Sequence, residues 1–324
     1  MSRRILAVAG VAVFLSASAS AQTYTTFTVS GATTTTPTAI GGDGAVAGFY
    51  EGGGTEHGFL RAPNGTITSF DPAGSISTTP SAIDKNDTIV GSYQTSDFVS
   101  HGFIRTADGT ITSFDPRHSK YTIATAIHGK TVGTLSRGKR HVLGFQRSRG
   151  GRIEEFQYPD AQVTEPRAIN GVDTIAGWYN GKDQVFHGFV RAPDGTFVSF
   201  DPAGSTHTAP AGIARDGTIT GYYDDDAGSH GFVRAPDGTL TSFDVSGATA
   251  TQPTAINADG TVAGTYLDAV PTEHGFFRST SGVISTFNVP DSTSTSAAAI
   301  NNKGMATGTY TTGSGGGGAY ILTP

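Results

Sequence analysis

The chain has 324 residues, with 27 acidic and 21 basic side chains and a net charge of −6 at neutral pH. A negative net charge argues against general nucleic-acid binding, and the absence of cysteine excludes disulfides and thiol chemistry. The 45 glycines and the single tryptophan are typical of a turn-rich β protein.

The first 21 residues have the pattern of a secretory signal peptide. Arg3 and Arg4 precede an apolar run, 5–15, and a stretch of small residues ends at Ala21. This order of basic, apolar and small residues marks a peptide that is removed during export. A membrane-spanning helix needs roughly 20 apolar residues, so this run is too short for a retained anchor. We therefore expect cleavage after Ala21 and a secreted protein, extracellular or periplasmic, without membrane insertion.

Residues 22–324 contain one motif repeated seven times. An isoleucine that follows alanine or glycine recurs every 42 to 44 residues, at Ile40, Ile83, Ile127, Ile169, Ile213, Ile256 and Ile300. Two further markers, a glycine in the second segment of each unit and a phenylalanine that ends the fourth, also count seven. A period of this length is the signature of a repeat architecture. The region 22–324 is therefore predicted to be one repeat domain.

Each unit contains four short segments with the composition of β-strands. In the second unit they read TTPSAID, TIVGSYQ, HGFIRT and TITSFD. Asn-Gly and Asp-Gly pairs, as at 64–65 and 237–238, join the third and fourth segments and favour tight hairpins because glycine accepts positive φ. Four antiparallel strands in about 40–50 residues form one blade of a propeller. The sequence predicts an all-β, seven-bladed β-propeller with four antiparallel strands per blade.

The two ends of the repeat region complement each other. The last unit ends on GAYILTP, which matches a third segment, so its fourth segment is missing. The region begins with TYTTFTV, which matches a spare fourth segment. We expect this N-terminal strand to close the last blade, which would remove an exposed sheet edge. A solenoid is the alternative, but a solenoid would need caps.

The units resemble the HAF-type extracellular repeats of secreted bacterial proteins. The shared residues read AIN and AG.Y, followed by HGF.R. Glycine stands where the name-giving His-Ala-Phe motif has alanine, at Gly58, Gly102, Gly188, Gly231 and Gly275. The resemblance spans essentially all of 22–324. It implies an exported repeat protein and brings no defined activity, cofactor or catalytic residue with it.

A histidine and an acidic or amide residue recur together in five units. The histidine opens the third segment, and its companion lies 14 positions later. Folded around the intervening turn, the two positions lie opposite each other on one face of a hairpin. Where the histidine is missing, as at Leu143, the acidic residue is missing too, as at Gln157. We predict structural cross-strand hydrogen bonds for His57 and Asp71, His101 and Asp115, His187 and Asp201, His230 and Asp244, and His274 and Asn288.

A catalytic or metal role is the alternative for these pairs, since histidine and carboxylate serve both purposes. One pair per blade on outer strands cannot converge on one ion, so we expect no metal, cofactor or catalytic site there. The arginines that share the histidine face by period two are expected to be structural as well. They are Arg61, Arg105, Arg191, Arg234 and Arg278.

The third unit carries an unusual number of basic residues. Nine of the 21 lysines and arginines lie between 117 and 152. On an acidic protein such a sector suggests an anionic partner, such as an acidic glycan or cell-surface polymer, or a protein. A solvated surface is the alternative interpretation. The candidate ligand-binding residues here are Arg137, Lys139 and Arg140.

Two other features are candidates for ligand binding. Trp178, which aligns with Phe49 and Tyr222, could stack on a sugar ring or fill space between blades. The run Asp224, Asp225 and Asp226 resembles a calcium site only loosely, since three consecutive acidic residues cannot all face one ion.

The sequence contains no G-x-S-x-G, H-E-x-x-H or phosphate-loop motif. We therefore expect a non-catalytic binding or scaffold module for a protein or glycan. One alternative is a carbohydrate-active hydrolase or lyase with its site at the mouth of the propeller channel, which a cluster of unpaired carboxylates with shifted pKa values would favour. A structural envelope or matrix protein is the other.

Overall fold

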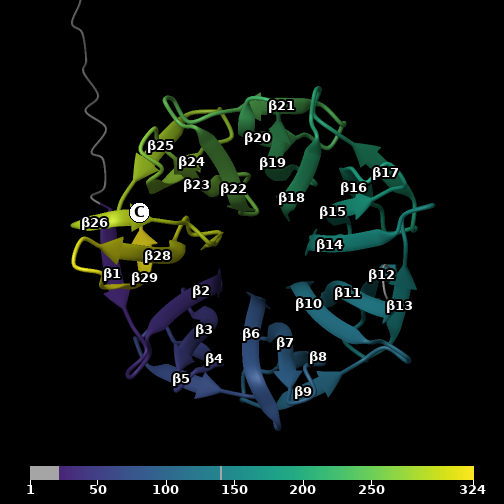
Figure 1. The fold of residues 1–324 in the computed structure, drawn as a ribbon, viewed down its shortest axis with the longest axis horizontal. Helices are drawn as coiled ribbons and strands as arrows, with labels where there is room; N and C mark the ends of the chain where they lie inside the picture. Colours follow the sequence, from purple (N-terminus) through teal and green to yellow (C-terminus); the bar gives the residue numbers. More distant parts are fainter. Residues whose placement is uncertain (1–21, 139–140) are drawn as a thin grey trace, which may run out of the picture.

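The computed structural model describes residues 22–138 and 141–324, which form 29 β-strands. The predicted signal peptide, 1–21, lies outside the described residues, as do Lys139 and Arg140. Figure 1 shows the strands arranged in a ring around a central axis, so the fold is all-β and propeller-like, as the sequence predicts. Within the described part of the chain, no helix is long and apolar enough to cross a membrane.

Successive groups of four strands follow one another along the chain, each running outwards from the centre of the ring (Figure 1). The first two groups are β2 (Thr34–Ile40), β3 (Val46–Gly52), β4 (Thr55–Arg61) and β5 (Ile67–Phe70), then β6 (Ser75–Ile83), β7 (Ile89–Thr95), β8 (Ser100–Arg105) and β9 (Ile111–Phe114). The next two are β10 (Tyr121–His128), β11 (Lys130–Gly138), β12 (His141–Arg147) and β13 (Ile153–Phe156), then β14 (Val163–Ile169), β15 (Ile175–Asn180), β16 (Phe186–Arg191) and β17 (Phe197–Phe200).

They are followed by β18 (His207–Ile213), β19 (Ile219–Asp225), β20 (Gly228–Arg234) and β21 (Leu240–Phe243), then by β22 (Ala250–Ile256), β23 (Val262–Leu267), β24 (Glu273–Arg278) and β25 (Ile284–Phe287). Within each group, consecutive strands pair antiparallel. Single parallel bridges, such as Val142 with Val163, join neighbouring groups. These bridges merge the groups from β2 to β9 into a sheet of 8 strands and those from β10 to β25 into a sheet of 16 strands. The strands at the two ends of the described chain form a separate sheet of 5.

The last group combines the two ends of the described chain. It contains β26 (Ser292–Thr295), β27 (Ala299–Ile300), β28 (Ala306–Thr312) and β29 (Gly317–Thr323), and β1 (Thr23–Phe27) pairs antiparallel with β29. In this group the inner strand is split in two. The stretch between β26 and β27 stays hydrogen-bonded to β28, with the Ser296 amide donating to the Thr309 carbonyl oxygen and the Ala298 amide to that of Thr307.

The glycine marker of the repeat allows the inner two strands of a group to approach closely. The pairing of β2 with β3 shifts register between Pro37 and Ala39, which is a bulge. Gly48 lies opposite Pro37, and a Cβ atom on Gly48 would lie 2.2 Å from the Thr36 carbonyl oxygen. The equivalent glycines have the same crowding, at Gly91, Gly133, Gly177, Gly221, Gly264 and Gly308.

The hydrophobic core lies between neighbouring groups. Each group contributes one fully buried aromatic ring from its third strand: Phe59, Phe103, Phe145, Phe189, Phe232, Phe276 and Tyr320. Most of these rings pack edge-on against the phenylalanine that ends the preceding group, as Phe103 does against Phe70 with 5.9 Å between ring centroids. Aromatic pairs favour this geometry.

Polar contacts tie the inner strands together. The Asn301 side-chain amide donates to the Gly41 carbonyl at 2.8 Å, which joins the last group to the first. Asn257 donates to Asn301 in the same way. The hydroxyl of Thr38 donates to the Pro80 carbonyl at 2.8 Å. The asparagine and threonine of the repeat therefore serve contacts between groups.

The crowding at Gly48 gives a testable prediction. Gly48→Ala should lower the free energy of unfolding by about 1–3 kcal/mol, because the added methyl group overpacks the bulge. Urea denaturation of the variant measures this loss. Gly42→Ala is the matched control, since Gly42 has no heavy atom within 4 Å of the added Cβ. Equal stabilities of the two variants would contradict the role of the bulge glycine.

Candidate functional site

The repeated histidines have hydrogen-bond partners on both ring nitrogens. Nδ1 of His57 lies 2.7 Å from an Asp71 carboxylate oxygen, and its Nε2 lies 2.8 Å from the Thr55 hydroxyl. The structure likewise brings together His101 with Asp115, His187 with Asp201, His230 with Asp244 and His274 with Asn288. The second nitrogens bond Thr95, Asp183, Asp225 and Asp268. An imidazole held at both nitrogens has no free lone pair for a substrate or a metal.

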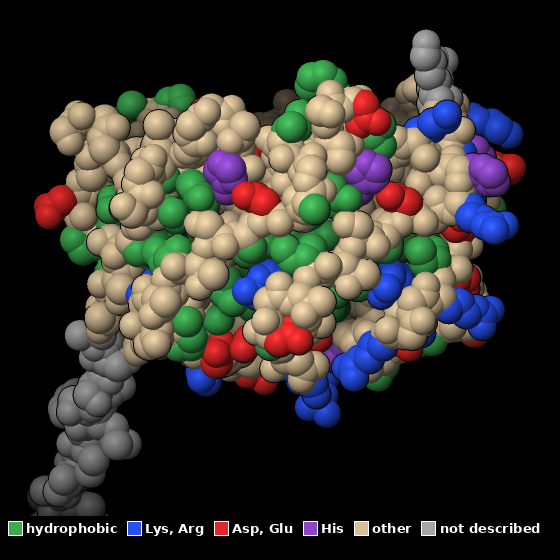
Figure 2. Space-filling view, turned by 90° about the horizontal axis from the view of Figure 1, so that it is seen from below, with side chains coloured by type: hydrophobic (Ala, Val, Ile, Leu, Met, Phe, Trp, Pro, Cys, Tyr) green, Lys and Arg blue, Asp and Glu red, His purple; other side chains and the backbone are tan. Residues whose placement is uncertain are grey.

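Figure 2 shows histidine side chains along the outer wall near one rim, with acidic side chains beside them. In two of the units the histidine lies between two carboxylates. Burial by itself lowers the pKa of His187, but the hydrogen bonds and charges of Asp201 and Asp183 outweigh it and raise that pKa. Hydrogen bonding to Asp244, with the nearby charge of Asp225, raises the pKa of His230.

The repeated arginines lie between neighbouring groups. The guanidinium carbon of Arg105 lies 5.0 Å from the centre of the Phe70 ring, which ends the preceding group. The same contact joins Arg61 to Phe27, Arg147 to Phe114, Arg191 to Phe156, Arg234 to Phe200 and Arg278 to Phe243. Desolvation lowers the pKa of Arg105. These arginines are nearly buried and act in packing.

The basic third unit is partly neutralised by its own neighbours. Arg137 forms a two-pronged ion pair with the Glu155 carboxylate and donates to the Arg117 carbonyl at 2.7 Å. Lys130 pairs with Asp173 at 2.8 Å. Of the three candidates for an anionic ligand, Arg137 is thus engaged within the protein, and Lys139 and Arg140 lie outside the described residues.

The three consecutive aspartates have separate contacts. Asp224 accepts hydrogen bonds from His207 and Ser229, and Asp225 caps the Ala227 amide and pairs with His230. Asp226 is exposed. Among residues 22–138 and 141–324, no group of three or more histidine, aspartate or glutamate side chains could hold a metal ion.

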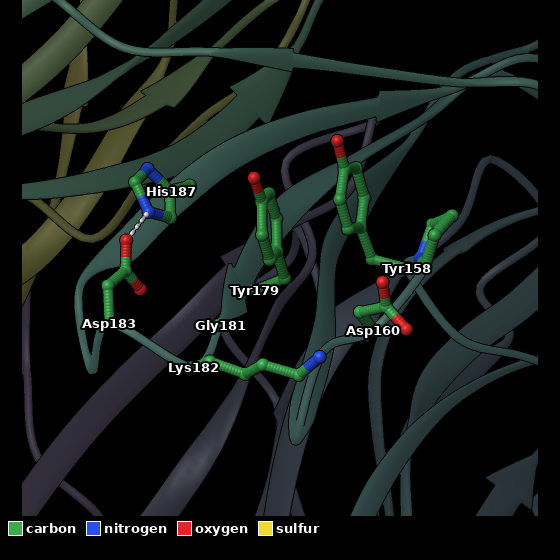
Figure 3. Close-up of a pocket in the computed structure, with 8 residues that line it drawn as sticks. Tyr158, Asp160, Tyr179, Gly181, Lys182, Asp183 and His187 are labelled. Atoms are coloured by element: carbon green, nitrogen blue, oxygen red, sulfur yellow. Dashed lines mark hydrogen bonds and ion pairs between the residues drawn. The ribbon is translucent and has the colours of Figure 1, made fainter.

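An open hollow of about 350 Å³ lies where the loop before β14 meets the hairpin of β15 and β16 (Figure 3). The rings of Tyr158 and Tyr179 stack in parallel in its wall, with 3.6 Å between their centroids. Burial has the largest effect on the Tyr179 hydroxyl and, with Tyr158 and the charge of Asp201, raises its pKa to about 12. Lys182 extends towards Asp160, and Asp183 bonds His187 (Figure 3). The hollow has polar groups for binding, but its imidazole is already held at both nitrogens.

A second cluster lies at the innermost strands, on the other face of the same hairpin. Trp178 is directly opposite Glu165 in the pairing of β15 with β14, so the two side chains share a face. Trp178 packs edge-on against Phe186, with 4.8 Å between the ring centroids. The half-buried Glu165 carboxyl has no hydrogen bond or ion pair with any described residue, and its desolvation raises its pKa against the opposing charge of Arg167.

His207 continues this cluster into the next group. Its ring packs against those of Phe186 and Tyr222, with 4.9 Å and 5.9 Å between the ring centroids. Nδ1 lies 3.2 Å from an Asp224 carboxylate oxygen. Within the described part of the chain, Nε2 of His207 has no hydrogen-bond partner, unlike both nitrogens of every repeated histidine. An imidazole oriented at Nδ1 and free at Nε2 is suited to accept a proton.

The cluster defined by Glu165, Arg167, Trp178, Phe186, His207, Tyr222 and Asp224 is called the inner-strand cluster below. Sequence analysis identified Trp178 and Asp224 as candidates but missed Glu165, Arg167 and His207. The available signal was their departure from the repeat. On the inner strands β2, β6, β10, β14, β18, β22, β26 and β27, the only aspartate, glutamate, lysine or arginine residues are Glu165 and Arg167.

No family model matches the chain, and no curated protein matches it in sequence. Solved structures do match. A catalytically inactive histidine-to-alanine variant of virginiamycin B lyase from Staphylococcus aureus, solved with quinupristin, has a TM-score of 0.62 and 13% identity, covering 94% of this chain and 100% of that one. The propeller domain of the Trilobed protease from Pyrococcus furiosus has a TM-score of 0.63 and 10% identity, covering 88% and 93%.

Puromycin hydrolase matches with a TM-score of 0.61 and 13% identity, over 87% of this chain and 51% of the hydrolase. These likenesses show the propeller-like fold. They also correct the expectation of a non-catalytic binding or scaffold module, because the matched structures are enzymes or domains of enzymes.

The raised pKa values of His187 and His230 predict a pH-dependent contribution to stability. A raised pKa in the folded state stabilises the fold below the ordinary histidine value of 6.5, and this stabilisation is lost as the pH rises through the folded pKa. The deficit in Tm of the His187→Gln, His230→Gln double variant should therefore be larger at about pH 5.5 than at about pH 8.5.

Thermal unfolding across this pH range measures the deficit. His141→Gln is the control, because the one hydrogen bond of exposed His141 to other described residues is a 3.3 Å contact with Gln157. A deficit that grows with pH would contradict the assignment.

Proposed function

We propose that the protein is a carbohydrate-active hydrolase or lyase whose catalytic site is the inner-strand cluster. The observation that carries this proposal is His207, which is backed by Asp224 at Nδ1 and free at Nε2, in the same contiguous cluster as the unpaired Glu165. Both hydrolysis and elimination of a glycoside need one group that removes a proton and one that supplies it.

The roles follow from the two environments. Glu165 is partly desolvated and has no cationic partner in hydrogen-bond contact, which favours its protonated form and a role as general acid. His207 is held in one orientation by Asp224, which supports a role as general base. Different environments that separate an acid from a base are characteristic of catalytic pairs.

The aromatic side chains of the cluster supply a binding surface. Trp178 shares a face with Glu165 and packs against Phe186, which packs against His207. The Tyr222 ring packs edge-on against His207. Aromatic rings bury the apolar faces of sugar rings while their polar edges keep hydrogen bonds. The matched lyase, hydrolase and protease structures support an enzymatic use of the fold. The proposed substrate class is inferred from the aromatic residues of the cluster.

We place this site on a seven-bladed propeller with four strands per blade, in which β1 closes the last blade. The seven marker glycines support seven equivalent hairpins, and the pairing of Thr23 to Phe27 with Thr323 to Ala319 supports the closure. The site then lies at the wall of the central channel, since β14 and β18 are inner strands (Figure 1). The predicted signal peptide and the resemblance to HAF-type repeats further support an exported enzyme.

Substitution of the acid and the base tests the proposal. Glu165→Gln and His207→Asn should each lower kcat/KM by about 10²–10⁴-fold, because each removes one proton-transfer partner. The assay follows bond cleavage across a panel of neutral and acidic glycans by the release of new chain ends. Asp226→Asn is the control, since exposed Asp226 adjoins the cluster without contacting it. Cleavage that persists unchanged in both variants would refute the assignment.

A further inference from the structure

Among the described residues of the inner strands, one cationic side chain has no contact that the fold uses. In the inner strands a bulge places one residue between the proline or alanine and the following strand residues, as at the shift between Pro166 and Ala168. This residue is small and uncharged in the other bulged inner strands: Thr38, Ser81, Thr125, Ala211 and Thr254. In β14 it is Arg167, which is exposed.

Arg167 also differs from the repeated arginines. Those are nearly buried against phenylalanine rings, as Arg105 is on Phe70. Within the described residues, no hydrogen bond, ion pair or ring contact of the Arg167 guanidinium is found. An arginine on a channel-lining strand without an internal partner is available to an anionic ligand.

The charge of Arg167 acts on two members of the inner-strand cluster. Arg167 lies two residues after Glu165 on β14, and β14 lies beside β18. Its charge lowers the pKa of Glu165 and of Tyr222 against the raising effect of burial. Tyr222 in turn packs against His207 at 5.9 Å. A carboxylate bound by Arg167 would therefore lie beside the acid and the base of the proposed site.

We propose that the substrate is a uronate-containing polysaccharide, whose carboxylate Arg167 binds, and that the reaction is β-elimination. This inference rests on the function proposed above and adds the substrate class and the bond that breaks. A guanidinium forms paired hydrogen bonds with a carboxylate, which gives both affinity and orientation. The same contact stabilises the charge that develops on the carboxylate when the adjacent C–H bond is broken.

The step balances without water or a redox partner. Nε2 of His207 removes the proton from the carbon that bears the carboxylate, and the electron pair of that C–H bond forms a carbon–carbon double bond. The bond from the next ring carbon to the glycosidic oxygen breaks, and that oxygen takes the proton of Glu165. Solvent then returns a proton to Glu165 and removes one from His207. The products are an unsaturated uronate end and a free hydroxyl end.

Binding can be measured separately from catalysis, because Trp178 is the single tryptophan and belongs to the cluster. A polygalacturonate oligomer should change the fluorescence of the full secreted chain, and a neutral galactan oligomer of the same length should not. Arg167→Gln should weaken uronate binding by about tenfold or more, and added salt should weaken it too. Arg215→Gln is the matched control, since exposed Arg215 lies in the turn after the next inner strand.

The reaction has a distinct product. Elimination gives an unsaturated uronate that absorbs in the ultraviolet, whereas hydrolysis gives new chain ends without that absorbance. Equal binding of neutral and acidic oligomers, absence of any fluorescence change, or indifference to Arg167→Gln would overturn the inference. Cleavage of a neutral glycan that needs Glu165 and His207 but not Arg167 would overturn it while leaving the proposed function in place.

Discussion

The contact between the arginine of one group and the phenylalanine that ends the preceding group is the interaction on which the ring arrangement most depends. In this contact a guanidinium lies 4.6–5.1 Å from a ring centre, nearly buried between two sheets. A cation over an aromatic face gains about 0.5–2 kcal/mol, more when water is excluded.

Several of these arginines bury a hydrogen-bond donor that has no acceptor within the described part of the chain. The Nε atoms of Arg105, Arg191, Arg234 and Arg278 are buried without a hydrogen-bond partner in the described residues. A buried donor left unpaired is unfavourable, so the aromatic contact and the bonds from the terminal nitrogens must offset it. For Arg191 one such bond is an ion pair with Glu154 at 2.7 Å. The same arrangement recurs around the ring, which explains why the arginine is kept in nearly every unit.

In the proposed function, the catalytic and binding residues are those that depart from the repeat, while the repeated contacts hold the scaffold. The five repeated histidines resemble catalytic residues in composition, but each has both nitrogens bonded within its own unit. His207 has the same carboxylate backing and an unbonded Nε2, and it lies next to the inner strand that carries Glu165 and Arg167. The tyrosine pair of the outer hollow arises in the same way, because Tyr158 stands where the other units have a buried proline or valine.

The sequence by itself determined the strands, the period and the pairing of His57 with Asp71, because alternation, turn glycines and a fixed 14-residue spacing act locally within a hairpin. It also pointed to the pairing of TYTTFTV with the last strand, since the two ends supply complementary segments. Tertiary structure decided which polar residues meet across groups. Glu165 and His207 are far apart in the chain and belong to no motif, and only the packing of adjacent sheets brings Trp178, Phe186 and His207 into one cluster. Tertiary structure likewise paired Arg137 with Glu155, because the partner of a charged side chain is set by neighbours that sequence spacing does not reveal.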